Sequence, residues 1–297
     1  AAGHYSQITA TTTSRVSFAS ETTMSLLSLT PAGATCDVWY DAYDRSTITL
    51  DDGRITAVAD KSGGIAYNLT NSDGTATRHP EYSEADGALV YTEDVDQYLS
   101  HSTFDPDYDE VTFFFSYTST GDGDHLLTVV QDNNSSSGDF GVRLATVGGS
   151  ATQGNIKYYI GRTQSSNLNV EGVWTTGLKR VMTFTHKNST NASRFRLIGH
   201  DSTTTTAVTE LNKTVVSDET TNLQGSIGQA GLLVGGDVDS GGWPDSVDVN
   251  IHEIAIYNKY MTEAEAAPIE EYFLNHGPPS SPAQTQPGIG LAINSRR

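Results

Sequence analysis

The fold class follows from the stretch VTFFFSY at residues 111–117, which is apolar on both of its faces. A strand with one face in water alternates apolar and polar residues, so this stretch indicates a strand buried inside a β sandwich. Similar short apolar runs follow along the chain, with polar or glycine-rich turn clusters between them. This spacing predicts an antiparallel sandwich. The other predicted strands are residues 88–91, 97–99, 126–130, 140–144, 156–160, 180–185, 194–198, 231–236 and 249–257.

Only residues 262–275 have the pattern of a helix. Thr262 is a candidate N-cap, and Glu265 follows at the spacing of a capping box. Gly277 lies where a glycine commonly ends a helix. We therefore predict one short helix after the last strand.

The composition bounds the class of protein. Hydrophobic residues are 36% of the 297 residues and 28 are glycine, a mixture too poor in helix formers for a helical bundle. No apolar run approaches the roughly 20 residues of a membrane-spanning helix. The net charge of −19 would repel nucleic acid and attract divalent cations. The single cysteine, Cys36, leaves no intrachain disulfide.

Three zones divide the chain. Residues 1–34 form a Thr/Ser-rich N-terminal arm, residues 35–277 carry the strand pattern, and residues 278–297 form a Pro/Ser-rich C-terminal arm. We expect both arms to be held by neighbouring subunits or another protein, the alternative being that they fold back on their own domain. The first residues, AAGHY, lack the basic and apolar regions of a signal peptide, and one removed before Ala1 would leave no trace.

Three groups of residues carry a family resemblance. The first is VWYDAYD at 38–44 with TITL at 47–50 and VADKSGG at 58–64; the second is GALVY at 87–91 with DQYL at 96–99; the third is IHEIAIYNKYMT at 251–262 with IEEYFL at 269–274. In this order they resemble the concanavalin A-like (laminin G-type) jelly-roll modules of phage and bacterial structural proteins. The resemblance covers about residues 36–277 and departs from the family at Ala59, where a large residue is usual.

This resemblance implies an all-β, concanavalin A-like jelly-roll sandwich of two antiparallel sheets, with one short C-terminal helix and extended terminal arms. It also implies that the matching residues are mostly architectural. We expect residues 60–63 to shape a turn. The side chains expected to fill the space between the two sheets are Trp39, Tyr98, Leu99, Ile254, Ile256 and Tyr257.

Catalytic patterns are weak. Glycosidases of this fold place carboxylates on alternate residues of one strand, and the nearest run here, EDVD at 93–96, has no third acid in that spacing. The eight histidines are scattered and no Gly-x-Ser-x-Gly elbow occurs. Cys36 adjoins a presumed core strand, which favours packing over catalysis. We therefore expect a protein that is not an enzyme, although carboxylates from separate strands could still converge.

Metal and sugar binding have better candidates. Laminin G-type modules often bind calcium through loop carboxylates, and by that likeness Asp237 and Asp239 are the first candidate ligands, followed by Asp122 and Asp124. The alternative is that these are solvated turn acids. Sugars stack on exposed aromatic rings, so Trp243, between glycines and a proline, and Trp174 are candidate carbohydrate or partner contacts.

Two functional hypotheses from different classes follow. The first is a non-enzymatic structural protein of a virus particle, such as a capsid decoration, turret or fibre component, which forms a homo-oligomer and binds other virion proteins through its arms. Such a protein could also bind a host surface glycan. The alternative is a secreted carbohydrate-binding lectin module or glycan-processing enzyme, at the cell surface or outside the cell. An adhesion or surface-layer protein shares features of both.

Overall fold

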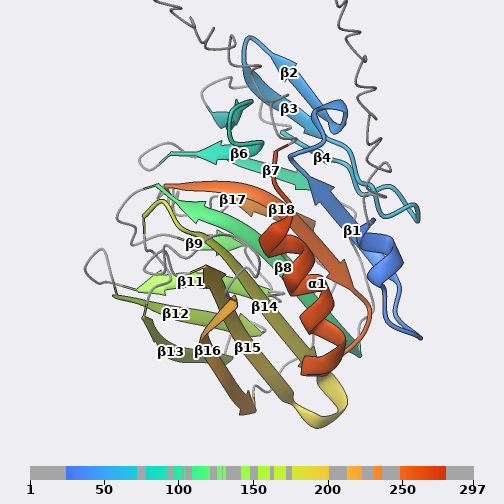
Figure 1. The fold of residues 1–297 in the computed structure, drawn as a ribbon, viewed down its shortest axis with the longest axis vertical. Coiled ribbons are helices and arrows are strands. Elements are labelled where there is room, and N and C mark those ends of the chain that lie inside the picture. The colour runs from blue at the N-terminus through green and yellow to red at the C-terminus, as the bar shows by residue number, and fades with distance from the viewer. Residues whose placement is uncertain are drawn as a thin grey trace, which may run out of the picture.

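The computed structural model describes residues 25–71, 78–92, 97–101, 104, 109–120, 126–128, 130–131, 142–147, 153–160, 164–171, 176–200, 213–222, 231–235 and 248–278. These residues are almost entirely β, with one α-helix near the C-terminal end (Figure 1). No helix among them is long and apolar enough to cross a membrane. The strands are β1 (Cys36–Asp41), β2 (Ile48–Asp51), β3 (Arg54–Val58), β4 (Leu69–Thr70), β5 (Glu81–Ser83), β6 (Ala88–Tyr91), β7 (Tyr98–His101), β8 (Glu110–Ser119), β9 (Leu126–Thr128), β10 (Val130–Gln131), β11 (Val142–Val147), β12 (Gln153–Ile160), β13 (Gln164–Glu171), β14 (Lys179–Lys187), β15 (Ala192–His200), β16 (Lys213–Asn222), β17 (Gly231–Gly235) and β18 (Val249–Tyr257).

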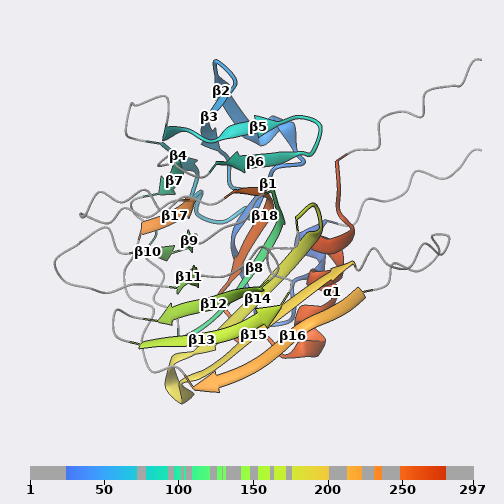
Figure 2. The ribbon, with the colours of Figure 1, turned by 90° about the vertical axis from the view of Figure 1, so that its left-hand side faces the viewer.

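Within the described residues all strand pairs are antiparallel, and they form two sheets. The larger sheet has fourteen strands along the path β10-β17-β7-β4-β3-β5-β6-β18-β8-β14-β15-β16, with β1 beside β18 and β2 beside β3. The smaller sheet has the order β13-β12-β11-β9. The larger sheet curls, so that its two halves face each other as the layers of a sandwich (Figure 2). The predicted fold class, an all-β antiparallel jelly-roll sandwich with one short C-terminal helix, is confirmed.

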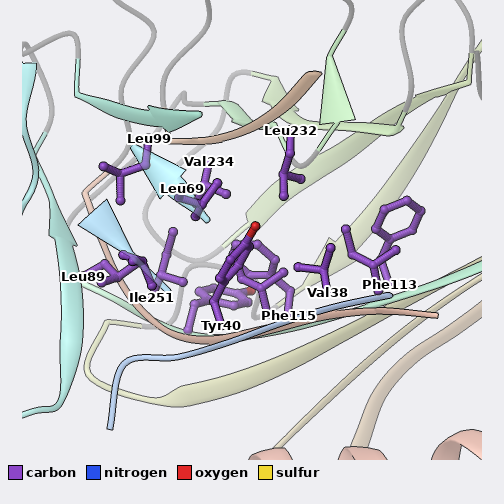
Figure 3. Packing of buried hydrophobic residues seen from close by; sticks show 14 of the residues in the cluster. Val38, Tyr40, Leu69, Leu89, Leu99, Phe113, Phe115, Leu232, Val234 and Ile251 are labelled. Atoms are coloured by element: carbon purple, nitrogen blue, oxygen red, sulfur yellow. The ribbon is translucent and has the colours of Figure 1, made fainter. Parts of the chain in front are cut away.

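The main core lies between the facing halves of the curled sheet. Side chains from β4, β7 and β17 meet side chains from β1 and β8 across this space (Figure 3). Residues on alternate positions of β8 point into it, as the period of two along a strand requires. Buried members of this cluster include Val38, Tyr40, Leu69, Leu89, Leu99, Phe113, Phe115, Leu232, Val234, Ile251, Ile254 and Ile256.

A second apolar layer covers the outer face of the same sheet. Helix α1 (Glu263–Asn275) packs there together with the short 3₁₀ helix η1 (Leu26–Leu29). Phe114 of β8 stacks on Phe273 of α1, with ring centroids 6.0 Å apart. This explains why residues 111–117 are apolar on both faces: one face meets the sandwich core and the other meets the helix.

The predicted start of the helix is confirmed. The backbone N–H of Thr262 donates to the Glu265 carboxylate at 2.9 Å, as in a capping box. At the other end the helix stops at Asn275, and His276 rather than Gly277 is the C-cap.

The interior positions expected from the family resemblance are correct only in part. Leu99, Ile254 and Ile256 lie in the sandwich core. The prediction was wrong for Trp39 and Tyr257, which lie in the outer layer under α1. It was also wrong for Tyr98, which is only partly buried. A strand that is covered on both sides is apolar throughout, so its sequence does not show which face is the inner one.

Asp60 shapes the turn that the sequence predicted at residues 60–63. Its carboxylate accepts hydrogen bonds from the backbone N–H groups of Trp39 at 3.0 Å, Ser62 at 2.8 Å and Tyr67 at 3.1 Å. The hydroxyl of Ser62 donates to the same carboxylate at 3.1 Å. In return, the N–H of Lys61 donates to the carbonyl oxygen of Trp39. The turn therefore satisfies backbone groups along the outer edge of β1.

Part of the predicted N-terminal arm packs on the sandwich. Leu26 is fully buried in the outer apolar layer, although residues 1–34 were expected to be an arm. Residues 1–24 and 279–297 lie outside the described residues. The division at 34/35 and 277/278 stays a prediction.

Candidate functional site

Buried charged side chains meet where β1 and β18 pair beneath the end of helix α1. Asp41, the last residue of β1, lies directly opposite Glu253 of β18 in the register of the pair. Both side chains are buried, with Glu253 fully so. His276, the C-cap of α1, approaches from above the sheet. Lys61 joins from the turn after β3, and Lys179 from the start of β14. We call these five residues the carboxylate–histidine cluster.

Ion pairs and a hydrogen bond connect the residues of the cluster. Nδ1 of His276 lies 3.0 Å from Oε1 of Glu253. The Lys61 ammonium is 2.7 Å from Oδ2 of Asp41 and 2.9 Å from Oδ2 of Asp44, so one cation is shared by two carboxylates. Lys179 donates a hydrogen bond to the backbone carbonyl oxygen of His276. The cluster therefore fixes the C-terminal end of the helix to two strands of the sheet.

Aromatic rings surround these charges. The ring of Tyr43 stacks on His252 with centroids 5.3 Å apart, and meets His276 edge-on at 5.1 Å. Tyr272 packs against His276 from the helix side, at 4.9 Å. The ammonium of Lys179 lies 5.0 Å from the centre of the Tyr43 ring. These contacts exclude water from much of the cluster and strengthen the charge interactions within it.

Burial and neighbouring charge shift the titration of the cluster. Burial raises the pKa of Glu253, because the charged carboxylate loses its hydration. Burial also acts to lower the pKa of His276, but the adjacent Glu253 carboxylate outweighs it, and the pKa is raised. Desolvation lowers the pKa of Lys179 to about 8. The shifts of Glu253 and His276 both favour the protonated form of the group.

Two buried atoms of the cluster have no hydrogen-bond partner among the described residues, Oε2 of Glu253 and Nδ1 of His276. Oε2 of Glu253 is buried and unpaired, while Oε1 of the same carboxylate faces His276 and, at a long 3.4 Å, the indole N–H of Trp39. A buried carboxylate oxygen without a hydrogen-bond donor or a cation beside it is energetically unfavourable. Asp41, Glu253 and His276 each offer a ligand atom, and these three atoms lie within 4.8 Å of one another. Chemically, the group can hold a proton or a cation.

A second polar group lies between β14 and β15. Nδ1 of His186 is 2.8 Å from Oγ of Ser193, and its Nε2 is 2.8 Å from Oδ1 of Asn188. The order of contacts is that of a nucleophile, a base and an orienting group. Ser193 and His186 are both buried, however, so the hydroxyl does not face a substrate. We interpret this group as a tie between the two strands.

None of the site residues predicted from the sequence can be placed. The candidate calcium ligands Asp237, Asp239, Asp122 and Asp124 lie outside the described residues, and so do Trp243 and Trp174. These assignments stay predictions.

The carboxylate–histidine cluster is not predicted as a group by the sequence. Asp41, Lys61 and Glu253 stand in stretches expected to be architectural, and His276 is one of eight scattered histidines. One signal was available: Glu253 interrupts the apolar run IHEIAIY, and an acid within a buried strand requires a partner.

Comparisons with known proteins give structural likeness only. No family model matches the chain, and no curated protein matches it. Among solved structures, the Trypanosoma rangeli sialidase is similar over 80% of this chain and 32% of its own, with 12% identity and a TM-score of 0.44. Tailspike protein 2 of the Escherichia coli O157:H7 bacteriophage CAB120 is similar over 63% of this chain and 24% of its own, with 10% identity and a TM-score of 0.43.

A third similar structure is the CBM40 module of the Ruminococcus gnavus IT-sialidase bound to sialyllactose. It is similar over 62% of this chain and 96% of its own, with 9% identity and a TM-score of 0.41. This chain spans about a third of the sialidase chain and about a quarter of the tailspike chain.

Proposed function

We propose that this chain is a non-enzymatic structural component of a virus particle, a capsid decoration, turret or fibre protein, that displays its β sandwich and is held by its terminal segments. The observation that carries the proposal is the position of the two described chain ends. Leu26, near the first described residue, packs in the same apolar layer as Phe273 and Leu274, near the last. Both ends of the described chain therefore lie on the helix-covered side of the sandwich (Figure 1).

This arrangement suits attachment on one side and display on the other. Neighbouring copies would be engaged at the face where the described ends lie, while the layer of β4, β7 and β17 lies on the opposite side of the core. The carboxylate–histidine cluster supports a scaffold role, because it holds the end of α1 against β1 and β18. Its two carboxylates are buried, whereas a hydrolase needs them open to a substrate.

The calcium and glycan parts of the hypothesis rest on other residues. The strongly acidic chain favours a divalent cation, and we propose Asp237, Asp239, Asp122 and Asp124 as calcium ligands. Trp243 and Trp174 are the proposed contacts for a host glycan. A glycan array probed with the full chain and with Trp243→Ala tests the second role.

Self-association of the full chain tests the structural role. Sedimentation velocity over a wide concentration range should show a concentration-dependent multimer. Trypsin cleavage after Arg15, in the N-terminal segment, should be slower in that multimer than in the dilute monomer. A chain that stays monomeric throughout, with Arg15 cut equally fast at every concentration, contradicts the proposal. Release of reducing sugar from a polysaccharide would support the glycan-processing alternative.

A further inference from the structure

The carboxylate–histidine cluster has the donors of a small metal site. Asp41, Glu253 and His276 come from three separate elements, β1, β18 and the end of α1, and their ligand atoms converge within 4.8 Å. The ligands of a zinc ion lie about 2.0–2.2 Å from the metal, so the three side chains would close in on a bound ion and Asp41 would exchange its contact with Lys61 for it. The approach of His276 Nδ1 to Glu253 Oε1, at 3.0 Å, leaves these two donors facing each other.

An independent feature points to a missing partner at this place. Oε2 of Glu253 has no hydrogen bond, although the side chain is fully buried. The other oxygen of the Glu253 carboxylate, Oε1, faces His276. The unpaired Oε2 therefore lies close to the three ligand atoms of Asp41, Glu253 and His276. A buried carboxylate oxygen of this kind is unfavourable when it is empty and becomes favourable when it binds a cation.

The nearby lysines do not neutralise the carboxylates completely. Lys61 lies within ion-pair distance of both Asp41 and Asp44, so its single charge is divided. Lys179 donates to the carbonyl oxygen of His276, and among the described residues no ion pair joins its ammonium to Asp41 or Glu253. Asp41 and Asp44 therefore share the single ammonium of Lys61, and within the described part of the chain Glu253 is paired only with the imidazole of His276. A divalent ion on Asp41 and Glu253 would leave Lys61 to Asp44.

We infer that Asp41, Glu253 and His276 form a binding site for a divalent first-row transition metal ion of the zinc class. One imidazole nitrogen with two carboxylates is a donor set that suits Zn²⁺ or Co²⁺. Calcium requires six to eight oxygen ligands, which this group does not supply. The site is separate from the loop aspartates proposed to bind calcium, and the inference does not depend on the virion role.

Metal titration of the full chain tests this inference. Zn²⁺ should raise the melting temperature, and Co²⁺ should produce the intense visible absorption of a four- or five-coordinate site. His276→Gln and Asp41→Asn should each weaken Co²⁺ binding about tenfold or more. His101→Gln is the matched control, because it removes a histidine on β7 that contacts Asn68 and Tyr67 rather than the cluster. This control should bind Co²⁺ as the unmodified chain does.

Two results would overturn the inference. One is a Co²⁺ spectrum that stays that of the hydrated ion, with no change of melting temperature on adding Zn²⁺. The other is binding that survives His276→Gln unchanged, which places the ion elsewhere on this acidic chain. Because Asp41→Asn also removes an ion pair with Lys61, each variant is first checked for a native circular dichroism spectrum. If Asp41→Asn does not fold, His276→Gln decides, since its side chain lies at the end of the helix.

Discussion

Asp60 offers the sharpest test of how the first strand is held. Asp60→Ala removes the acceptor of three backbone N–H groups, those of Trp39, Ser62 and Tyr67. Trp39 is buried, so its N–H loses its partner fully, at a cost of about 2–3 kcal/mol. The N–H groups of Ser62 and Tyr67 are partly exposed and can donate to water instead, so losing each of these hydrogen bonds costs only about 0.5–1 kcal/mol. We therefore expect a loss of about 4 kcal/mol in the free energy of unfolding.

Urea unfolding followed by tryptophan fluorescence measures this loss, provided that the slope of the transition does not change. Asp60→Asn keeps one carbonyl oxygen as an acceptor and should lose about half as much. Asp44→Ala is the control, because the Asp44 carboxylate accepts from Ser46 in an exposed turn and pairs with the partly exposed Lys61, contacts that together should contribute about 1 kcal/mol. If Asp60→Ala costs no more than Asp44→Ala, the reasoning about the edge of β1 is wrong.

Three further predictions concern the helix start, a strand end and the thiol. Hydrogen bonds from Lys259 and from the N-cap Thr262 lower the pKa of Glu265 from 4.5 to about 2. The ionised Glu265 therefore stabilises the folded protein fully above pH 4.5, and this stabilisation is lost as the pH falls toward 2. Glu265→Gln should therefore lower the melting temperature near neutral pH, and a difference that persists at pH 2 contradicts this. Gly235→Ala should cost about 3 kcal/mol or more in urea unfolding, because Gly235 has φ +94° and a Cβ would collide with the Tyr91 ring and lie 2.6 Å from the carbonyl oxygen of Gln97. A loss below about 1 kcal/mol would show that these neighbours move aside. Burial raises the pKa of Cys36 to about 12, so a thiol reagent should label it only as fast as the protein unfolds, and rapid labelling of the native chain refutes its burial.

The sequence predicted the strands that are covered by protein better than those at the sheet margins. Each run with a strong apolar pattern overlaps an observed strand, and β8 and β18 were predicted nearly to their ends. Two long strands that were not predicted, β13 and β16, are polar: QSSNLNVE and KTVVSDETTN. Each is the last strand of its sheet. A terminal strand has fewer apolar neighbours, so its sequence carries little of the pattern on which the prediction depends.

The candidate site was less predictable, for a physical reason. Asp41 and Glu253 become neighbours through the pairing of β1 with β18, and His276 joins them only when α1 folds over the sheet. No local spacing in the sequence records these tertiary contacts. The sequence did show an acid, Glu253, within an apolar strand. Such an acid indicates that a buried partner exists but not which residue it is.

The central position of β18 has a consequence for how the chain is made. This strand pairs with β8 on one side, and with β6 and then β1 on the other, so residues 249–257 join segments that are synthesised far earlier. Until those residues leave the ribosome, the nascent chain has several unpaired strand edges that are prone to aggregation, and its hydrophobic core is incomplete. Such non-local closure slows folding, and truncation before residue 249 should yield insoluble material rather than a smaller folded protein.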